Sequence, residues 1–313
     1  MGRGIAHAFA YAGHEIRLVD SKPRDAEQYR RVCEDALNEI SGSLTSIAEI
    51  GGFDPSATDG IMARVAIAPY EQARSALASV HHIFEAVPET EEAKKAALAF
   101  IHENAERDAT VASTTSTFLS THLAEFSGRP ERFLNAHWLN PAFLVPLIEL
   151  SPTPQTDRAV VEEFKSLLTS IGKVPVECAA SPGYIVPRIQ ALAMNEAARL
   201  VEEGVATAED IDKAVKYGFG FRFAVLGLLE FIDWGGGDIL YYASRYLAGA
   251  MNDKRFETPK IVRDNMAAGR NGLREGKGFL DYSGMDVPAY RRARLAEFQR
   301  MLQQAGLAKP PVL

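Results

Sequence analysis

The chain has little cysteine, no excess of positive charge and no long apolar run. Its 313 residues include two cysteines, Cys33 and Cys178, which lie far apart in sequence. They predict neither a disulfide framework nor a zinc site, and they fit a reducing cytoplasm. A formal net charge of −7 disfavours general binding of nucleic acid. No apolar stretch is long enough to span a bilayer, so we expect a globular cytoplasmic protein with neither a membrane nor a nucleic-acid partner.

The first 180 residues alternate short apolar runs with helical patterns. Runs rich in β-branched and aromatic residues are typical of strands. The expected strands are EIRLVD, RVAIAP, HHIFEAVPE, TVAST, FLNAHW, LVPLIEL and KVPVEC. Alternating strands and helices favour a parallel sheet covered on both faces. Residues 1–180 are therefore predicted to form an α/β, doubly wound domain.

The pattern changes after Pro182-Gly183. The next segments carry helical periodicity with few strand signals between them. They are 184–203, 208–217, 224–247, 256–267 and 288–306. We expect a domain boundary near residue 180 and an all-helical second domain over 181–313.

The chain opens with part of a dinucleotide-binding pattern. Rossmann-type domains carry G-x-G-x-x-G at the first strand-to-helix turn and, about 20 residues on, an acidic residue that holds the ribose hydroxyls. Here Gly2 fits the third glycine, and Asp20 ends the strand EIRLVD. An Asp at this place favours NAD over NADP, because a carboxylate repels the additional phosphate. The alternative is a flexible glycine and an aspartate in a turn.

The first strand of this pattern and its first two glycines are absent from the sequence. That strand lies at the centre of a doubly wound sheet, and each unpaired buried backbone group costs about 1–3 kcal/mol. We therefore expect the protein to start upstream, with Met1 an internal methionine and an apolar strand followed by Gly-x-Gly encoded in frame before it.

Segments spread over residues 1–283 resemble those of the L-3-hydroxyacyl-CoA dehydrogenase family. In chain order they are MGRGIAHAFAYAGHEIRLVD, EAVPE, ASTTST, HWLNP, PLIEL, SPGYIV and EGKGF. The resemblance implies NAD-dependent oxidation of a 3-hydroxyacyl group in fatty acid metabolism. It also implies a Rossmann-type NAD-binding domain followed by a helical domain for substrate binding and dimerisation, and hence a homodimer.

By the family pattern, Ser116, His137 and Glu149 match the catalytic Ser, His and Glu. Alcohol oxidation needs a base for the hydroxyl proton, and histidine serves near neutral pH. A carboxylate can fix the imidazole tautomer, and a serine can bond the reacting oxygen. Each residue has an ordinary alternative: a packed histidine before Trp138, a serine that caps the next helix, and a charge at a strand edge.

The resemblance also assigns cofactor contacts. Besides Gly2 and Asp20, the positions that line the cofactor in the family fall at Glu89, Lys94, Asn140 and Arg274. The bound dinucleotide supplies the hydride chemistry. No metal is expected, because no ligand spacing accompanies His81-His82.

Three features depart from the family. Pro187 stands where the family has an Asn that helps to bind the substrate oxygen, and Asn195 lies about 12 Å further along the helix. Residues 32–63 contain no Lys or Arg, which suits coenzyme A phosphates poorly. Residues 218–230 resemble relatives that act on free hydroxy acids, such as L-gulonate and L-carnitine dehydrogenases. Arg222 there can pair with a substrate carboxylate or make a surface or interface salt bridge.

Three functions stay open. The first is a dehydrogenase for an L-3-hydroxyacyl-CoA or a related 3-hydroxy acid, and the second is an enzyme for free 3-hydroxy acids that does not use CoA. The third is a catalytically silent protein on a dehydrogenase scaffold, as in some lens crystallins. Pro187 and the incomplete fingerprint favour the third, whereas Ser116, His137 and Glu149 oppose it.

Overall fold

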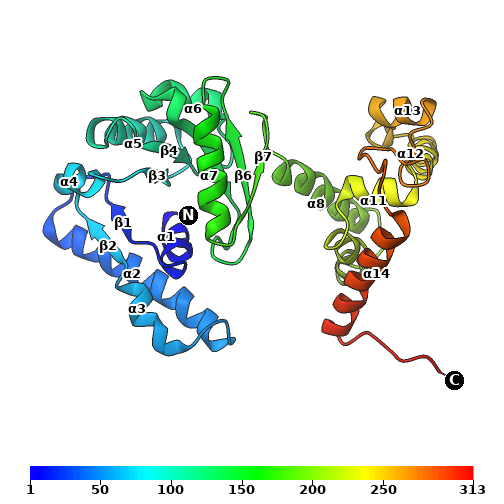
Figure 1. The fold of residues 1–313 in the computed structure, drawn as a ribbon, viewed down its shortest axis with the longest axis horizontal. Helices are drawn as coiled ribbons and strands as arrows, with labels where there is room; N and C mark the ends of the chain where they lie inside the picture. The colour runs from blue at the N-terminus through cyan, green and yellow to red at the C-terminus, as the bar shows by residue number, and fades with distance from the viewer. Residues whose placement is uncertain (313) are drawn as a thin grey trace. The chain divides into compact units, whose positions relative to one another are not determined.

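The computed structural model describes residues 1–312 and divides into two compact units, residues 1–193 and the residues from 194 onward. Figure 1 shows strands and helices in the first unit and helices in the second. The predicted succession of an α/β region and a helical region is therefore confirmed. Within residues 1–312, no helix combines the length and the apolar character needed to cross a bilayer.

Helices and strands alternate along the first unit, close to the predicted ranges. The strands are β1 Ile16–Val19, β2 Val65–Ala68, β3 His82–Glu85, β4 Thr110–Ser113, β5 Phe133–Trp138, β6 Leu147–Pro152 and β7 Val174–Glu177. The helices are α1 Gly2–Tyr11, α2 Ala26–Glu49, α3 Thr58–Met62, α4 Ala73–Leu77, α5 Glu91–Asn104, α6 Ser120–Ser127 and α7 Arg158–Ser170. Side-chain caps fix the N-termini of α2 and α5, because Asp25 accepts a hydrogen bond from Gln28 N and Thr90 accepts one from Ala93 N.

The strands form a parallel pair, β1-β2, and a five-stranded sheet in the order β3-β4-β5-β6-β7. The expectation of an all-parallel arrangement was wrong at one place, since β5 and β6 are antiparallel. The sequence places no helix between FLNAHW and LVPLIEL, and a short loop returns the chain in the opposite direction. The remaining neighbours in the larger sheet are parallel.

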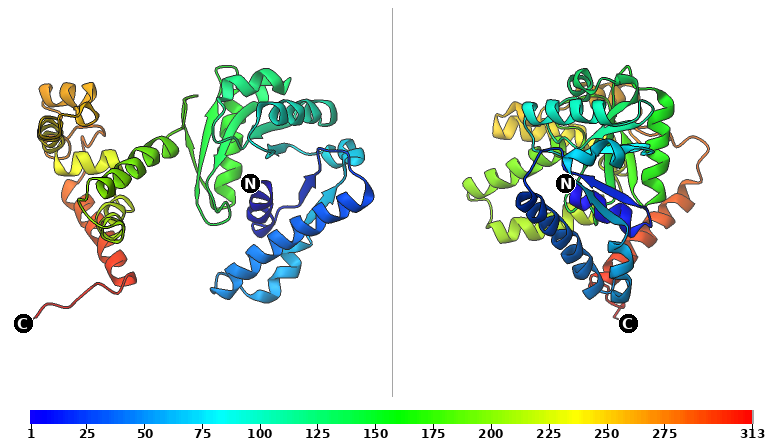
Figure 2. Two further views of the ribbon diagram at one scale, coloured as in Figure 1. Left: turned by 180° about the vertical axis from the view of Figure 1, so that it is seen from behind. Right: turned by 90° about the vertical axis from the view of Figure 1, so that its left-hand side faces the viewer.

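Helices cover both faces of the larger sheet (Figures 1 and 2). Alternate residues of β5 point to opposite faces. Leu134 and Trp138 pack with Phe9 of α1 and Phe164 of α7, whereas Phe133 packs against α5 and α6. By the same alternation, the side chain of residue 137 lies on the α5–α6 face.

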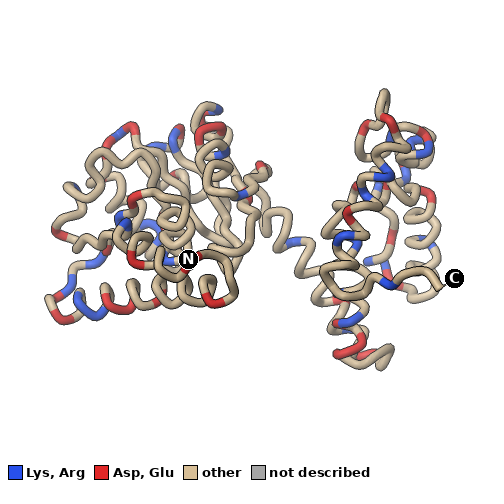
Figure 3. The backbone as a smooth tube through the Cα atoms, turned by 60° about the horizontal axis from the view of Figure 1, so that its bottom comes forward, with Lys and Arg blue, Asp and Glu red and all other residues tan. Residues whose placement is uncertain are grey.

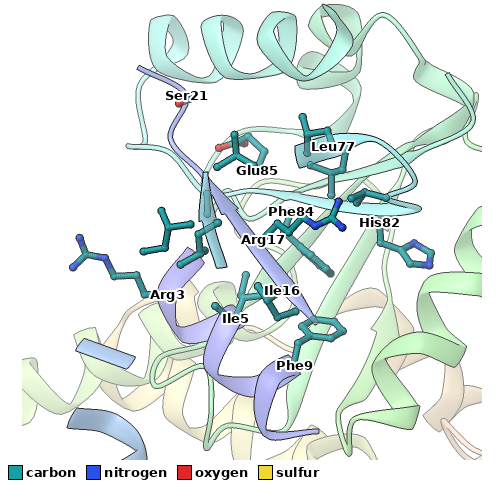
Figure 4. Close-up of a pocket in the computed structure, with 18 of the residues that line it drawn as sticks. Arg3, Ile5, Phe9, Ile16, Arg17, Ser21, Leu77, His82, Phe84 and Glu85 are labelled. Atoms are coloured by element: carbon teal, nitrogen blue, oxygen red, sulfur yellow. The ribbon is translucent and has the colours of Figure 1, made fainter. Parts of the chain in front are cut away.

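A cavity of about 910 Å³ is lined by both β1 and β3. Each of these strands has one edge without a partner strand within residues 1–312. Figure 4 shows apolar side chains of this lining, among them Ile16 and Phe84, together with the carboxylate of Glu85. Gly2 and Asp20 line the same cavity, so the chain brings the two residues of the fingerprint to one place.

The regular elements described over residues 194–312 are helices. They are α9 Ala208–Ala214, the π-helix η4 Val215–Gly220, α10 Phe221–Phe223, α11 Leu228–Gly235, α12 Gly237–Met251, the 3-10 helix η5 Lys254–Phe256, α13 Lys260–Ala267 and α14 Val287–Gln304, while α8 Val186–Glu202 spans the division. The segment 224–247, predicted to be helical, contains two helices. They are separated at Gly236, whose φ of 113° lies in a region that favours glycine.

Asp233 of α11 holds the loop that contains EGKGF. Its buried carboxylate accepts hydrogen bonds from Phe279 N (2.9 Å), Leu280 N (2.8 Å) and the Tyr282 hydroxyl (3.2 Å). A Cβ on Gly278 would lie 2.0 Å from Asp233 Oδ1. The motif is therefore a tightly packed loop that tolerates only glycine at this position.

Candidate active site

His137 and Glu149 lie directly opposite each other on the antiparallel strands β5 and β6. Opposed residues on such strands project to the same face, and here His137 Nδ1 lies 2.8 Å from Glu149 Oε2. His137 is 5% exposed and Glu149 is fully buried. The pairing leaves Nε2 as the imidazole nitrogen available to another molecule.

Backbone groups of the SPGYIV segment hold Glu149 in place. Ile185 N and Val186 N each donate a hydrogen bond of 2.8 Å to Glu149 Oε1. Both carboxylate oxygens are therefore engaged, one by the imidazole and the other by two amides. Together these contacts fix the orientation of the carboxylate.

Tyr184, in the same segment, stacks on His137. The ring centroids lie 4.8 Å apart and the ring planes differ by 6°. The Tyr184 hydroxyl donates to Thr115 O at 2.9 Å and accepts from Asn135 Nδ2 at 3.0 Å. Burial raises the pKa of the Tyr184 phenol, so the hydroxyl stays protonated at neutral pH. Sequence reasoning missed this residue, although it lies within a segment that carries the family resemblance.

Ser116 lies in the exposed loop between β4 and α6. It does not cap the following helix, which begins at Ser120 after Leu119. The loop is gathered around Glu89, whose Oε1 accepts hydrogen bonds from Ser116 N (2.9 Å), Thr117 N (3.0 Å) and the hydroxyls of Thr115 and Thr117. Burial raises the pKa of Glu89, but hydrogen bonds from Thr115 and Thr117 and the nearby Lys94 outweigh it, leaving the pKa at about 2.

Lys94 is buried, with 1% of its surface exposed. Its Nζ lies 3.0 Å from Glu85 Oε1 and 3.4 Å from Glu89 Oε2. Glu85 also accepts hydrogen bonds from Val87 N (2.8 Å) and the Ser113 hydroxyl (2.6 Å). The structure thus joins the predicted residues Glu89 and Lys94 directly, and it adds Glu85, which the sequence reasoning did not single out, as a second partner of Lys94.

Gly2 and Asp20 fit one end of a dinucleotide. A Cβ on Gly2 would lie 3.2 Å from the Cβ of Ala86, so the glycine permits close packing there. Helix α1 starts without a side-chain cap, and free amides at a helix start suit a pyrophosphate. Asp20, just after β1, accepts a hydrogen bond from Lys22 N and pairs with Arg24, which leaves a fixed carboxylate at the place where ribose hydroxyls bind in this type of fold.

Three predicted residues remain, Asn140 in the first unit and Arg222 and Arg274 in the second. Asn140 is exposed in the loop between β5 and β6. In the second unit, Arg222 Nε donates to Gly218 O at 2.9 Å, and its guanidinium lies 4.9 Å from the centre of the Phe231 ring. Arg274 pairs with Asp238 at 2.6 Å.

A Rossmann-type α/β unit that carries a buried histidine–carboxylate pair, followed by a helical unit, defines the architecture of a two-domain NAD-dependent dehydrogenase. The model of the 3-hydroxyacyl-CoA dehydrogenase NAD-binding domain matches residues 1–181, and the model of the C-terminal domain of the same family matches residues 183–282. The chain belongs to the 3-hydroxyacyl-CoA dehydrogenase family, and it is an NAD-dependent oxidoreductase of that type.

Two relatives whose names give different substrates have the same sequence identity to this chain. The chain is 29% identical to 5-formyl-3-hydroxy-2-methylpyridine 4-carboxylate 5-dehydrogenase of Mesorhizobium japonicum, over 97% of this chain and 95% of that protein. It is also 29% identical to mitochondrial hydroxyacyl-coenzyme A dehydrogenase of Sus scrofa, over 90% of this chain and 88% of that protein. Among solved structures, 3-hydroxyacyl-CoA dehydrogenase of Archaeoglobus fulgidus superimposes with a TM-score of 0.75 at 28% identity, covering 98% of this chain and 96% of that one.

Proposed function

We propose that this protein oxidises an L-3-hydroxyacyl-CoA or a related 3-hydroxy acid to the 3-oxo compound, with His137 as general base and Glu149 as its partner. The observation that carries the proposal is the buried contact of 2.8 Å between His137 Nδ1 and Glu149 Oε2. A base whose orientation is fixed by a carboxylate is what proton removal from an alcohol requires. The proposed site thus supplies the proton chemistry within one rigid sheet.

In this mechanism the substrate hydroxyl gives its proton to His137 Nε2. The Nδ1–H group donates to Glu149, whose other oxygen accepts hydrogen bonds from Ile185 N and Val186 N, so the imidazolium that forms lies beside the carboxylate. The Ser116 hydroxyl donates a hydrogen bond to the reacting oxygen. NAD, when bound, would supply the acceptor for the hydride, while His137 holds the proton taken from the hydroxyl and then releases it to solvent.

The cofactor residues are proposed from the same geometry and from the family resemblance. Asp20 would hold the ribose hydroxyls of NAD, and the amides at the start of α1 near Gly2 would bind its pyrophosphate. Glu89 and Lys94 would line the cofactor near the loop of Ser116, to which Glu89 is bonded. Asn140 and Arg274 complete the predicted lining.

A free acid is the second candidate substrate, with Arg222 pairing with its carboxylate. Two observations favour it. Residues 32–63 contain no Lys or Arg, and the relative from Mesorhizobium japonicum, whose named substrate is a carboxylate, aligns over 97% of this chain. Lys, Arg and acidic residues are interspersed along both units (Figure 3). Comparing specificity constants for 3-hydroxybutyrate-like acids and their CoA thioesters decides between the two candidates, and a thioester preferred by a large factor excludes the free acid.

The experiment that tests the proposal is NADH formation with a panel of 3-hydroxy acids and 3-hydroxyacyl-CoA thioesters. His137→Gln should lower kcat by about 10²–10⁴-fold, the usual contribution of acid–base catalysis. His122→Gln, at a half-buried histidine of α6 that pairs with Glu91, is the matched control and should keep normal turnover. No NADH with any substrate of the panel would favour the silent scaffold, and normal turnover of His137→Gln would refute the assigned base.

We also propose that the protein is a cytoplasmic homodimer assembled through the helical unit, acting in fatty acid metabolism. Ile239, Tyr242 and Tyr246 lie on one face of α12 and are 61%, 59% and 74% exposed. Large apolar side chains grouped on one helix face are typical of a surface covered by another subunit. Light scattering at micromolar concentration should give the mass of a dimer, and a monomer mass would contradict this assignment.

A further inference from the structure

Tyr184 connects the two parts of the proposed site that carry the reacting groups. Its ring lies parallel to that of His137, with centroids 4.8 Å apart. Its hydroxyl donates to the carbonyl oxygen of Thr115 at 2.9 Å, and Thr115 is the neighbour of Ser116. One side chain therefore contacts the imidazole at one end and the loop of Ser116 at the other.

The hydroxyl of Tyr184 is fully paired within the protein. Asn135 Nδ2 donates to it at 3.0 Å and also donates to Phe118 O at 2.9 Å. Because the amide occupies the acceptor side of the hydroxyl, the phenolic proton must point to Thr115 O. Asn135 lies two residues before His137 on β5 and so projects to the same face. The orientation of the ring is thus set by Asn135 on β5 and by Thr115 in the loop after β4.

The backbone of Tyr184 is held in an unusual conformation. Its φ of 44° lies in the left-handed region, which residues with a side chain rarely adopt. The next two amides, of Ile185 and Val186, are those that bind Glu149. Strained conformations of this kind persist where surrounding contacts over-determine them, and they cluster at functional sites. The same residue that stacks on the imidazole thus begins the turn that holds the carboxylate.

The stacked ring can affect the chemistry of His137 directly. The stacked ring fixes the plane of the imidazole, and the contact with Glu149 fixes its rotation within that plane. Neither of them binds Nε2. When the imidazole takes up a proton, its positive charge lies over the face of an aromatic ring, which attracts cations. An ordinary core residue would fill the same volume without this geometry.

We propose that Tyr184 is a positioning residue for His137, its ring holding the plane of the imidazole and stabilising the imidazolium, and its hydroxyl setting the spacing between His137 and the loop of Ser116. The proposal rests on the proposed function for its catalytic consequence, but the stacking itself is measurable without a substrate. Of the two contributions, the ring is the larger, because only the ring touches the base.

The test compares Tyr184→Phe, which keeps the ring, with Tyr184→Leu, which removes it. Tyr184→Leu should lower kcat by about 10–100-fold, the scale of effect of a misplaced catalytic group, with little change in the KM for NAD. Tyr184→Phe should stay within about tenfold of the wild type, the scale of one lost hydrogen bond. Tyr70→Leu is the matched control, because it removes a ring that stacks on Phe100, and its kcat should be unchanged.

Proton NMR of the histidine rings supplies a readout that needs no substrate. The His137 resonances, identified by their loss in His137→Gln, should be shifted upfield by the stacked ring in the wild type and in Tyr184→Phe. The upfield shift should disappear in Tyr184→Leu. Circular dichroism and NAD titration establish that each variant is folded.

The outcomes separate the proposal from the function on which it rests. A folded Tyr184→Leu with wild-type kcat, or one that keeps the upfield shift, would overturn the positioning role. A Tyr184→Phe variant as impaired as Tyr184→Leu would overturn it too, because the ring would then not be the decisive group. If the wild type oxidises no substrate, the proposed function fails, while the NMR comparison still decides whether Tyr184 orients His137.

Discussion

Replacing Glu149 by Gln is the sharpest test of the proposed proton chemistry, because the structure determines which way the new amide must face. In the wild type, Oε1 accepts hydrogen bonds from Ile185 N and Val186 N, and Oε2 lies against His137 Nδ1. A glutamine must keep its oxygen on the side of the two backbone donors, since its NH₂ group cannot accept their hydrogens. The NH₂ group therefore faces His137 Nδ1.

That orientation forces the imidazole into the wrong tautomer. With an amide donor facing it, Nδ1 must act as an acceptor, so the ring proton moves to Nε2, the nitrogen that has to take the substrate proton. In serine proteases, the loss of the correct tautomer in the histidine–carboxylate pair lowers kcat by about 10⁴-fold. This equals about 5.4 kcal/mol at 1.36 kcal/mol per tenfold. Because the imidazole here retains its stacking partner, we expect Glu149→Gln to lower kcat by about 10²–10⁴-fold.

The assay is steady-state NADH formation with the best substrate of the panel, together with NAD titration and thermal unfolding. NAD affinity and Tm should change little, because the glutamine keeps the shape and the two backbone hydrogen bonds. Glu162→Gln, at a glutamate with 54% of its side chain exposed on α7, is the matched control and should keep normal kcat. A folded Glu149→Gln enzyme with kcat within about threefold of the wild type, far short of the acid–base contribution, would refute the tautomer argument.

Three further predictions follow from named contacts. Asp20→Ala should narrow the preference for NAD over NADP, because it removes a carboxylate and frees its partner Arg24 to bind a 2′-phosphate. An unchanged ratio of kcat/KM for NAD to kcat/KM for NADP would contradict this. The pKa of Glu89 is about 2 against 4.5 for the free group, so the stability that Glu89 contributes is complete above about pH 4.5 and is lost as the pH falls towards 2. Between these pH values, chemical denaturation should show that the free energy of unfolding falls less in Glu89→Gln than in the wild type. Equal falls in the two proteins would exclude the assignment. Gly278→Ala would place a Cβ 2.0 Å from Asp233 Oδ1 and should destabilise the second unit by about 1–3 kcal/mol; an unchanged unfolding midpoint in urea would show that the loop can relax.

Local patterns in the sequence predicted most of the element positions. Strand signals such as TVAST and FLNAHW correspond to β4 and β5, and the helical pattern over 288–306 corresponds to α14. These predictions succeeded because periodicity and end signals act within a few residues of one another. The family and its cofactor were predicted from the order of seven short segments, which no local propensity can supply.

Long-range pairing decided the rest. The antiparallel register that opposes His137 to Glu149 depends on how two strands meet. The burial of Lys94 against Glu85 depends on a helix packing onto β3. Neither contact has a periodic signal, because the partners are chosen by the fold and not by sequence spacing.

The sequence by itself therefore determined the family, the succession of an α/β unit and a helical unit, and the residue types available for proton transfer. Only the tertiary structure decided that Tyr184 stacks on His137 and reaches Thr115. That arrangement needs segments about 70 residues apart to meet at one strand edge, with a backbone φ of 44° that tyrosine would not adopt alone. The physical reason is that many weak contacts, closed at once by packing, can hold a residue in a conformation that no local preference favours.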